Sequence, residues 1–232
     1  MPVSFADRLA FVRERVVAAC ARAGRDPATV TIVAVSKTQP IDAVTEAVAA
    51  GVDAIGENRV QEAAAKRPLV GGATPWHLIG PLQRNKAKTA LDLFDLIETV
   101  DRPELADRLE ALLGGSDRVL PVFLEVNIGG EAQKSGLNRE ASPALVERLL
   151  KRCPHLCLRG LMTVPPYDPD PQRSRPHFEA LRRLARELET RFALSPLQLS
   201  MGMTEDFEVA VEEGATEVRL GRVLFGERRP GP

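Results

Sequence analysis

The sequence predicts an α/β protein in which eight strands alternate with helices in a single (β/α)8 TIM barrel, with an extra N-terminal helix. The first observation is a set of apolar, β-rich runs that begin near Thr31, Asp53, Trp76, Asp95, Val119, Cys157, Pro196 and Thr216. The second is that helical segments separate these runs, which favours a parallel sheet. The third is the length of 232 residues, which suits one such barrel. An open, doubly wound sheet remains the alternative.

Each predicted helix follows its strand directly, and in chain order the segments are IDAVTEAVAAG, NRVQEAAAKR, QRNKAKTALD, RPELADRLEALLGG, SPALVERLLKRC, RPHFEALRRLARELETRF and EDFEVAVEEG. Before them, the charged amphipathic stretch MPVSFADRLAFVRERVVAACARAGRD predicts the extra helix, so that residues 1–30 form this helix and its lead-in. We expect one domain over residues 1–232. No apolar run has the length of a signal peptide core or a membrane span, so we expect a cytoplasmic protein.

The composition argues against two classes of partner. Lys and Arg total 31 against 32 for Asp and Glu, a net charge of −1, so the basic excess typical of nucleic-acid or membrane-surface proteins is absent. The three cysteines, an odd number, argue against a disulfide framework. CPHLC (residues 153–157) could suggest a metal, but no second Cys/His pair completes a tetrahedral set, and we expect no metal there.

Lys37 stands at the end of the first predicted strand, in TIVAVSKTQP. Burying an ammonium group is costly unless it is paired or neutralised. Active sites of β/α barrels lie at the C-terminal ends of the strands, which makes Lys37 a candidate functional residue. The alternative is a lysine whose ammonium group extends from the rim into solvent.

Other strand ends carry weaker candidates. Asn58 is predicted to cap the second helix, with Gln61 at the N3 position, and its side chain would also face the barrel mouth. His77 lies within the third strand and is expected to be a hydrogen-bonded core histidine rather than a catalyst. Lys134 lies in the glycine-containing loop NIGGEAQKSG and is expected to be solvated, with a role over the mouth as the minor alternative.

The last two strands predict an anion site. Barrel enzymes often bind phosphate with the loops after these strands, and glycine lets the backbone approach the anion. The segment LSMGMTEDF contains a turn at 200–202, and LGRVLFG contains Gly221 followed by Arg222. We expect phosphate to lie against Gly221 and Arg222, with Ser200 and Gly202 closing the far side.

The neighbouring helix restricts this expectation. Thr204 is predicted to cap the seventh helix, which would place Glu205 and Asp206 in its first turn, where they would repel an anion.

Arg219 is predicted to point into the barrel, because Val218 and Leu220 alternate with it along the last strand. The last strand neighbours the first when a barrel closes, and a buried arginine can lower the pKa of a nearby lysine. A structural ion pair with Glu217 or Glu57 is the alternative role for Arg219.

Seven segments cover nearly the whole chain and are specific in combination: AVSKTQP, IGENRVQE, WHLIGPLQRNK, VNIGGEAQKSGL, LRGLMTVPP, LSMGMTEDFEVAVEEGATEVRLG and FGER. Together they resemble the pyridoxal phosphate homeostasis protein family, single-domain relatives of the N-terminal barrel of alanine racemase, the type III fold of pyridoxal phosphate (PLP) proteins. The resemblance implies that Lys37 holds PLP as a Schiff base. It implies further cofactor-binding residues at Asn58, Ser200, Met201, Gly202, Arg219, Gly221 and Arg222.

Within this resemblance, Ser200, Gly221 and Arg222 would hold the phosphate, and Arg219 would face the pyridine nitrogen. Asn58, Met201 and Gly202 would line the pocket. Many family members have threonine at the position of Arg222, whose hydroxyl can bond phosphate; Arg222 keeps the backbone N–H of this position but lacks that hydroxyl. Schiff-base chemistry would also explain why a lysine stands at the strand end, since the reaction needs an amine there. The amine attacks a carbonyl only when it is neutral.

Three functions remain open. A non-enzymatic carrier or buffer of PLP, acting as a monomer with apo-enzymes as partners, is favoured. An amino-acid racemase needs a second acid/base group, which alanine racemase takes from a C-terminal β-domain, whereas this chain ends at Pro232 and its only tyrosine is Tyr167. Arg219 would also leave the ring nitrogen unprotonated and weaken the ring as an electron sink. A cofactor-free Schiff-base aldolase for a phosphosugar would also use Lys37, but no resemblance supports it.

Overall fold

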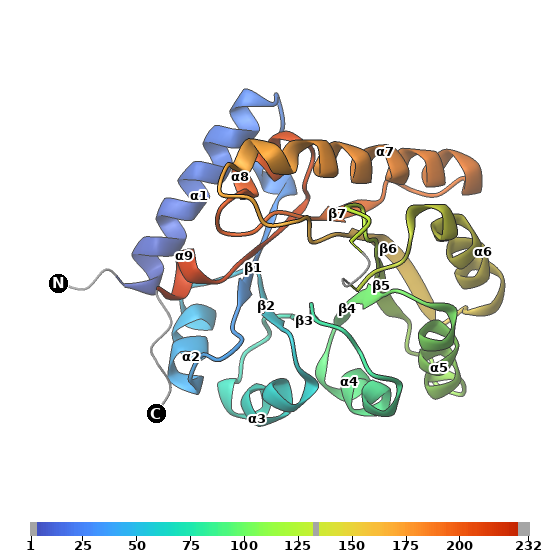
Figure 1. The fold of residues 1–232 in the computed structure, drawn as a ribbon. Coiled ribbons are helices and arrows are strands. Elements are labelled where there is room, and N and C mark those ends of the chain that lie inside the picture. Colours follow the sequence, from blue (N-terminus) through green and yellow to red (C-terminus); the bar gives the residue numbers. More distant parts are fainter. Residues whose placement is uncertain (1–3, 132–134, 227–232) are drawn as a thin grey trace.

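In the computed structural model, eight parallel strands close into a barrel and each pairs with the next along the chain (Figure 1). The structure describes residues 4–131 and 135–226. The strands are β1 (Thr31–Val35), β2 (Ala54–Glu57), β3 (Trp76–Leu78), β4 (Leu96–Val100), β5 (Leu120–Glu125), β6 (Leu156–Met162), β7 (Gln198–Ser200) and β8 (Glu217–Leu220). Closure comes from the pairing of β8 with β1, in which Arg219 aligns with Val33. The predicted barrel is therefore confirmed, and the open-sheet alternative is wrong.

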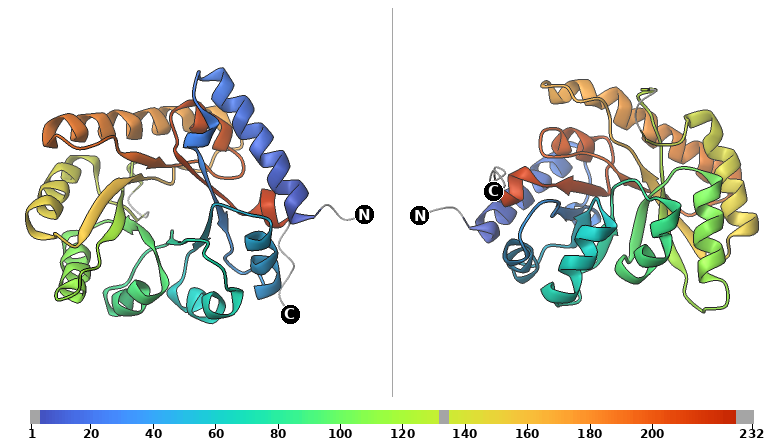
Figure 2. Two further views of the ribbon diagram at one scale, coloured as in Figure 1. Left: turned by 180° about the vertical axis from the view of Figure 1, so that it is seen from behind. Right: turned by 60° about the horizontal axis from the view of Figure 1, so that its bottom comes forward.

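The helices surround the strands on the outside of the barrel (Figures 1 and 2). The α-helices are α1 (Phe5–Arg22), α2 (Ile41–Ala49), α3 (Val60–Val70), α4 (Ala87–Leu93), α5 (Pro103–Leu113), α6 (Ser142–Arg152), α7 (Arg175–Phe192), α8 (Phe207–Glu212) and α9 (Arg222–Phe225). Short 3₁₀ segments are η1 (Pro27–Thr29), η2 (Arg84–Lys86), η3 (Arg139–Ala141) and η4 (Pro171–Ser174). Within the described ranges, no helix is both long and apolar enough to cross a membrane.

The predicted extra helix is α1, and a capping box defines its start. Ser4 Oγ accepts a hydrogen bond from the backbone N–H of Asp7 at 3.1 Å, and the Asp7 carboxylate accepts one from the backbone N–H of Ser4 at 3.0 Å. Side chains spaced three or four residues apart, such as Leu9, Val12 and Val16, form its buried face. This spacing places them on one side of the helix, which packs onto the barrel.

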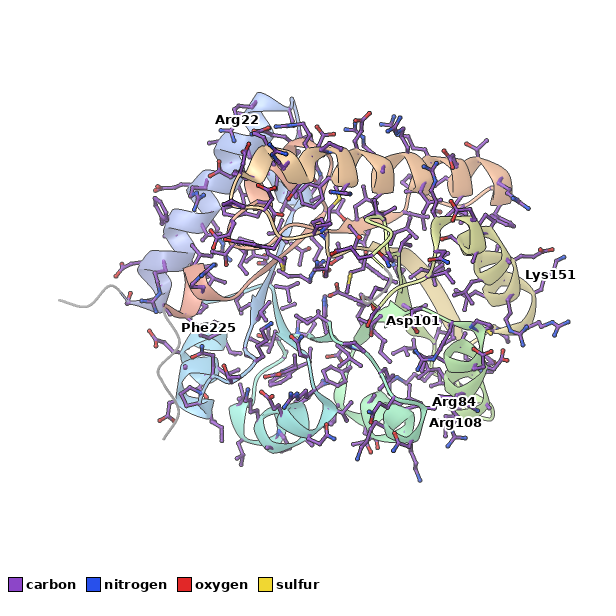
Figure 3. All side chains as sticks on the ribbon, viewed as in Figure 1. Arg22, Arg84, Asp101, Arg108, Lys151 and Phe225 are labelled. Atoms are coloured by element: carbon purple, nitrogen blue, oxygen red, sulfur yellow. The ribbon has the colours of Figure 1, made fainter. Side chains whose placement is uncertain are left out.

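Contacts at its two ends hold α1 against the last elements of the barrel. At the start, the rings of Phe5 and Phe225 lie 5.1 Å apart between centroids. At the end, Arg22 Nε donates to Glu212 Oε1 of α8 at 2.6 Å (Figure 3 labels Arg22 and Phe225). The N-terminal helix therefore covers the side of the barrel near the junction of β8 and β1.

The barrel interior differs from the layer between strands and helices. One large apolar cluster joins the helices to the outer faces of the strands. A separate small cluster contains Leu96, Phe123 and Met162. Buried polar and charged side chains on the strands are Glu57, His77, Glu98, Thr99, Glu125, Ser200, Glu217 and Arg219. A barrel interior is ordinarily filled by bulky apolar side chains, so this charge is a feature that requires a functional or structural reason.

Candidate functional site

The predicted site residues lie at four neighbouring strand ends. Lys37 follows β1, Asn58 follows β2, residues 200–202 end β7, and residues 221–222 follow β8. In the closed barrel these strands are adjacent in the order β7, β8, β1, β2. Because all the strands are parallel, their C-terminal ends meet at one end of the barrel. The structure therefore gathers the candidates in one sector of the barrel mouth.

Lys37 lies in a strained turn. The next residue, Thr38, has φ 64°, in the left-handed region that β-branched residues avoid. The backbone N–H of Thr38 donates to Glu62 Oε2 of α3 at 2.9 Å. Lys37 itself is half-buried. A carboxylate on α3 thus holds the turn that presents this lysine at the rim.

A buried ion pair lies beside the same turn. Lys66 Nζ of α3 donates to Glu57 Oε1 at 2.6 Å and to the carbonyl oxygen of Ser36 at 2.8 Å. Ser36 Oγ donates to the same carboxylate oxygen at 2.8 Å. Burial raises the pKa of Glu57, and the ammonium group of Lys66 opposes that rise. The sequence did not indicate this pair, because Glu62 and Lys66 at i and i+4 resemble an ordinary surface pair.

Asn58 does not cap the second helix, so that prediction is wrong. Helix α3 begins at Val60, its N-cap is Arg59, and no side chain caps it. Asn58 Oδ1 is instead buried and lacks a hydrogen-bond partner among the described residues. A buried amide oxygen without a partner is costly, and a bound ligand with a donor group would satisfy it.

Arg219 points into the barrel, as predicted. Its Nη1 donates to Ser200 Oγ at 2.5 Å and its Nη2 donates to the carbonyl oxygen of Thr163 at 2.8 Å. The carboxylate within ion-pair distance is that of Glu98, at 3.9 Å. Glu217 or Glu57 was the expected ion-pair partner of Arg219, and this expectation is wrong. Glu98 of β4 extends across the interior and takes that place.

The Ser200 hydroxyl also makes its hydrogen bonds inside the barrel. Its hydroxyl donates to Glu98 Oε2 at 2.5 Å while accepting from Arg219. In this arrangement the single hydroxyl proton of Ser200 is used inside the barrel, so a ligand at the mouth would have to compete with Glu98 for it.

Met201 and Gly202 contribute mainly through the backbone. The side chain of Met201 is fully buried in the large apolar cluster. Gly202 has φ 92°, and an added Cβ would lie 2.5 Å from Ala210 Cβ of α8. Only glycine suits this position, for a packing reason that is independent of any ligand.

The turn after β8 lies against the end of β1. Gly221 is the N-cap of α9, and an added Cβ would meet Val35 at 3.6 Å, an ordinary contact distance. The Arg222 guanidinium pairs with the carboxylate of Glu205. This pair directs the Arg222 side chain to Glu205 and neutralises the acidic charge expected to repel an anion. The turn can therefore offer backbone N–H groups to an anion.

The predicted start of the seventh helix is wrong. Helix α8 begins at Phe207, and its N-cap is Asp206 rather than Thr204. Asp206 Oδ1 accepts from the backbone N–H of Met203 at 2.7 Å, which stabilises a turn before the helix. Glu205 and Asp206 therefore precede the first helical turn.

His77 is a buried, hydrogen-bonded core histidine, as predicted. Its Nδ1 lies 3.2 Å from Glu98 Oε1 and 3.4 Å from Glu217 Oε1. Burial alone lowers the pKa of His77, but Glu217 and Glu98 outweigh it and raise that pKa to about 10. For Glu217, burial and the charge of Glu98 raise the pKa. The acidic residues in two apolar strand runs, LIETV and TEVRL, were the available signal for this cluster.

Glu125, at the end of β5, is a further candidate functional residue that the sequence analysis did not name. Its Oε2 is buried without a hydrogen-bond partner among the described residues. Burial, reinforced by the charge of Asp101, raises the pKa of Glu125 to about 7 (Figure 3 labels Asp101).

Three other features of the sequence analysis remain. Lys134 lies outside the described residues, so the expectation for it stays a prediction. Tyr167 is 79% exposed. In CPHLC, His155 Nδ1 lies 2.6 Å from Glu110 Oε1. Within the described ranges, the metal-ligating groups that converge are those of His77, Glu98 and Glu217.

Comparison with known proteins first defines the class. Residues 9–229 match the family described as alanine racemase, N-terminal domain. The alanine racemase of Clostridium difficile 630 superposes with a TM-score of 0.74 over 97% of this chain and 58% of that chain, at 14% identity. At that identity the likeness concerns the fold alone.

Closer relatives define the family. The chain is 43% identical over 224 residues to the pyridoxal phosphate homeostasis protein of Aquifex aeolicus, covering 96% of this chain and 98% of the relative. It is 45% identical over 231 residues to that of Pseudomonas aeruginosa, covering 98% and 97%. PipY of Synechococcus elongatus, solved with PLP bound, superposes with a TM-score of 0.84 at 36% identity over 96% of this chain and 100% of that chain. The chain belongs to the pyridoxal phosphate homeostasis protein family.

Proposed function

We propose that this chain binds pyridoxal 5′-phosphate at the C-terminal end of the barrel, holds it as a Schiff base on Lys37, and carries or buffers it. The observation that supports this most directly is the turn at Lys37, where Thr38 is held at φ 64° by Glu62. Strain of this kind persists when the surrounding structure maintains it, and it gathers at ligand sites. PipY, with PLP bound, shares the family and the fold.

The residues at the mouth fit this cofactor. The buried Asn58 Oδ1 without a partner offers an acceptor on one side of Lys37. On the other side, the turn at Gly221 has no side chain that would cover its backbone, and the Arg222–Glu205 pair removes a repelling charge. Bound PLP would supply an aldehyde for the lysine amine and a ring that can withdraw electrons. The barrel and its N-terminal helix would act as one PLP-binding unit.

The proposed role is carrying rather than catalysis. Racemisation requires an acid/base group on each face of the substrate, and Lys37 supplies one. Tyr167, the only tyrosine of the sequence, is 79% exposed. Arg219 is a cation held by Ser200 and Thr163. If its guanidinium faces the ring nitrogen of PLP, the positive charge keeps that nitrogen unprotonated. The aldolase hypothesis receives no support from the relatives found.

Absorption spectroscopy tests the binding proposal. We expect the protein incubated with PLP to show a yellow band that borohydride bleaches, with the pyridoxyl group on the tryptic peptide that contains Lys37. Lys37→Ala should lose the covalent label, and Lys134→Ala, the matched control, should retain it. Label found mainly on another lysine would overturn the assignment to Lys37.

Isotope exchange tests the carrier role. Enzymes typically turn over at about 1–10³ s⁻¹. We expect the PLP-loaded protein in heavy water to exchange the α-hydrogen of alanine or serine far more slowly than this. A missing acid/base group alone removes about 10²–10⁴-fold of rate. Exchange at enzymatic rates that disappears in Lys37→Ala would contradict the carrier role and support a racemase-like enzyme.

The last parts of the proposal are the transfer of PLP to apo-enzymes and the monomeric state. We expect the loaded protein to restore activity to an apo-enzyme that requires PLP. Sedimentation should show a monomer. Reactivation no faster than with the same concentration of free PLP would contradict delivery and leave buffering as the role.

A further inference from the structure

A second cluster of reactive side chains lies inside the barrel, on strands β3, β4 and β8. His77, Glu98 and Glu217 are all buried, with Glu98 fully so. Their ligand atoms lie within 4.8 Å of one another. Ser200 and Arg219, two of the residues expected to bind the cofactor, contact Glu98. The proposed function assigns no role to the three residues of the cluster themselves.

The spacing of the three donor atoms, which serves hydrogen bonds of His77, also fits a metal site. Metal–ligand bonds of 2.0–2.2 Å in a tetrahedral site place neighbouring ligand atoms about 3.3–3.6 Å apart. His77 Nδ1 lies 3.2 Å from Glu98 Oε1 and 3.4 Å from Glu217 Oε1. The single N–H proton at Nδ1 can point to only one of these carboxylates at a time. A single cation between the three atoms would contact all of them.

The charge of the cluster can accommodate a cation. Two buried carboxylates repel each other unless a positive charge lies beside them, a place that the His77 ring and Arg219 occupy. A divalent ion with neutral His77 would make the three ligands and the ion neutral together. The second oxygen of Glu98 accepts from Ser200 Oγ at 2.5 Å and lies 3.9 Å from Arg219 Nη1. These groups hold Glu98 in place from the far side, as outer partners of metal ligands do.

An entry path reaches the cluster from the N-terminal end of the barrel. A cavity of about 560 Å³ is lined by His77 and Glu217 together with first residues of several strands, including Thr31, Ala54 and Gln198. The exposed Arg159 also lines it, which connects the cavity to solvent. Water in this cavity can supply the remaining ligand.

We propose that His77 Nδ1, Glu98 Oε1 and Glu217 Oε1 bind one divalent transition-metal ion, of which Zn²⁺ is the best match, within the barrel. Nitrogen and oxygen donors in a tetrahedral arrangement suit Zn²⁺, and the related ion Co²⁺ takes the same geometry. The ion connects β3, β4 and β8 across the interior. Binding displaces the proton of His77 and therefore releases protons.

Metal binding to the full-length, chelator-treated protein tests this site. Zn²⁺ uptake is measured by equilibrium dialysis, and Co²⁺ uptake by its visible absorption, whose intensity distinguishes tetrahedral from octahedral coordination. We expect one equivalent of Zn²⁺ per chain, a tetrahedral Co²⁺ spectrum and proton release. Glu217→Gln and His77→Gln should each raise the dissociation constant by more than about 100-fold, since loss of even an outer partner costs 10–100-fold.

Two control variants distinguish this site from other ligands. Cys157→Ser removes a thiol that also lines the cavity, and Glu125→Gln removes another buried carboxylate of the interior. Both should bind Zn²⁺ as the wild type does. Loss of uptake in Cys157→Ser, equal uptake in all variants, or no uptake by the wild type at 100 µM Zn²⁺, would overturn the proposal. The wild-type measurement decides even where a ligand variant fails to fold.

Discussion

Glu125 should make the protein less stable as the pH rises toward neutrality. Burial and the charge of Asp101 raise the pKa of Glu125 from 4.5 to about 7. Between these values the unfolded chain ionises Glu125 while the folded chain keeps the proton. Fewer protons on the unfolded chain mean that the free energy of unfolding falls as pH rises, by about 1.4 kcal/mol per pH unit and about 3 kcal/mol in total.

Glu125→Gln removes this dependence, because glutamine stays neutral. The variant should match the wild type near pH 4 and exceed its free energy of unfolding by about 3 kcal/mol at pH 8. Urea unfolding, followed by the fluorescence of the only tryptophan, Trp76, measures both proteins at each pH; that side chain is 2% exposed. Glu14→Gln on the exposed face of α1 is the matched control. Wild-type and Glu125→Gln stabilities that run parallel from pH 5 to pH 8 would refute the reasoning.

Three further predictions concern other parts of the chain. Lys66→Met should lower the free energy of unfolding by about 3–5 kcal/mol by leaving the Glu57 carboxylate buried without its ammonium partner, and a second change, Glu57→Leu, should recover much of the loss in urea unfolding. Gly221→Val should weaken PLP much more than pyridoxal in a binding titration, and equal weakening would place the phosphate elsewhere; the Cβ that the change adds would lie 3.6 Å from its nearest neighbours, on Val35. Ala193→Gly should raise the melting temperature, with a gain of about 0.5–1 kcal/mol, because Ala193 ends α7 at φ 52°. Ala23→Gly, at a helix end with φ −98°, should give no such gain.

The strands could be predicted because their signal is local. Each observed strand begins within two residues of the predicted position, as with β1 at Thr31 and β7 at Gln198 against a predicted Pro196. Apolar runs of strand length, separated by helical periodicity, determine this alternation without reference to distant residues. The placement of Lys37 and Gly221 at one end of the barrel followed from the same reasoning, since parallel strands have their C-terminal ends together.

Helix starts were predicted less well, because the choice of cap depends on the loop before it. Asn58 has a suitable side chain, yet its carbonyl oxygen lies so close to the β3 loop that a Cβ at Gly80 would be 2.3 Å away. This close approach accompanies a helix that begins at Val60. At α8, the side chain of Asp206 bonds to Met203 and displaces the expected cap at Thr204. Both helices begin later than the sequence pattern indicates.

The charged interior could not be predicted, because its partners come from strands far apart in the chain. Glu98 meets Ser200 although 102 positions separate them. An acidic residue in an apolar strand indicates only that a partner must exist, since an unpaired buried carboxylate is costly. Which partner it finds depends on closure of the barrel, which brings β4, β7 and β8 around one space.

That closure also explains how the charge of Arg219, the residue proposed to face the ring nitrogen, is balanced inside the barrel. Its guanidinium is held by Ser200 and Thr163 and lies 3.9 Å from Glu98, so its position does not depend on a ligand. Glu98 in turn faces His77 through its other oxygen. A cation placed between His77, Glu98 and Glu217 would hold the carboxylate that faces Arg219. The interior cluster and the proposed cofactor site therefore share one carboxylate, that of Glu98.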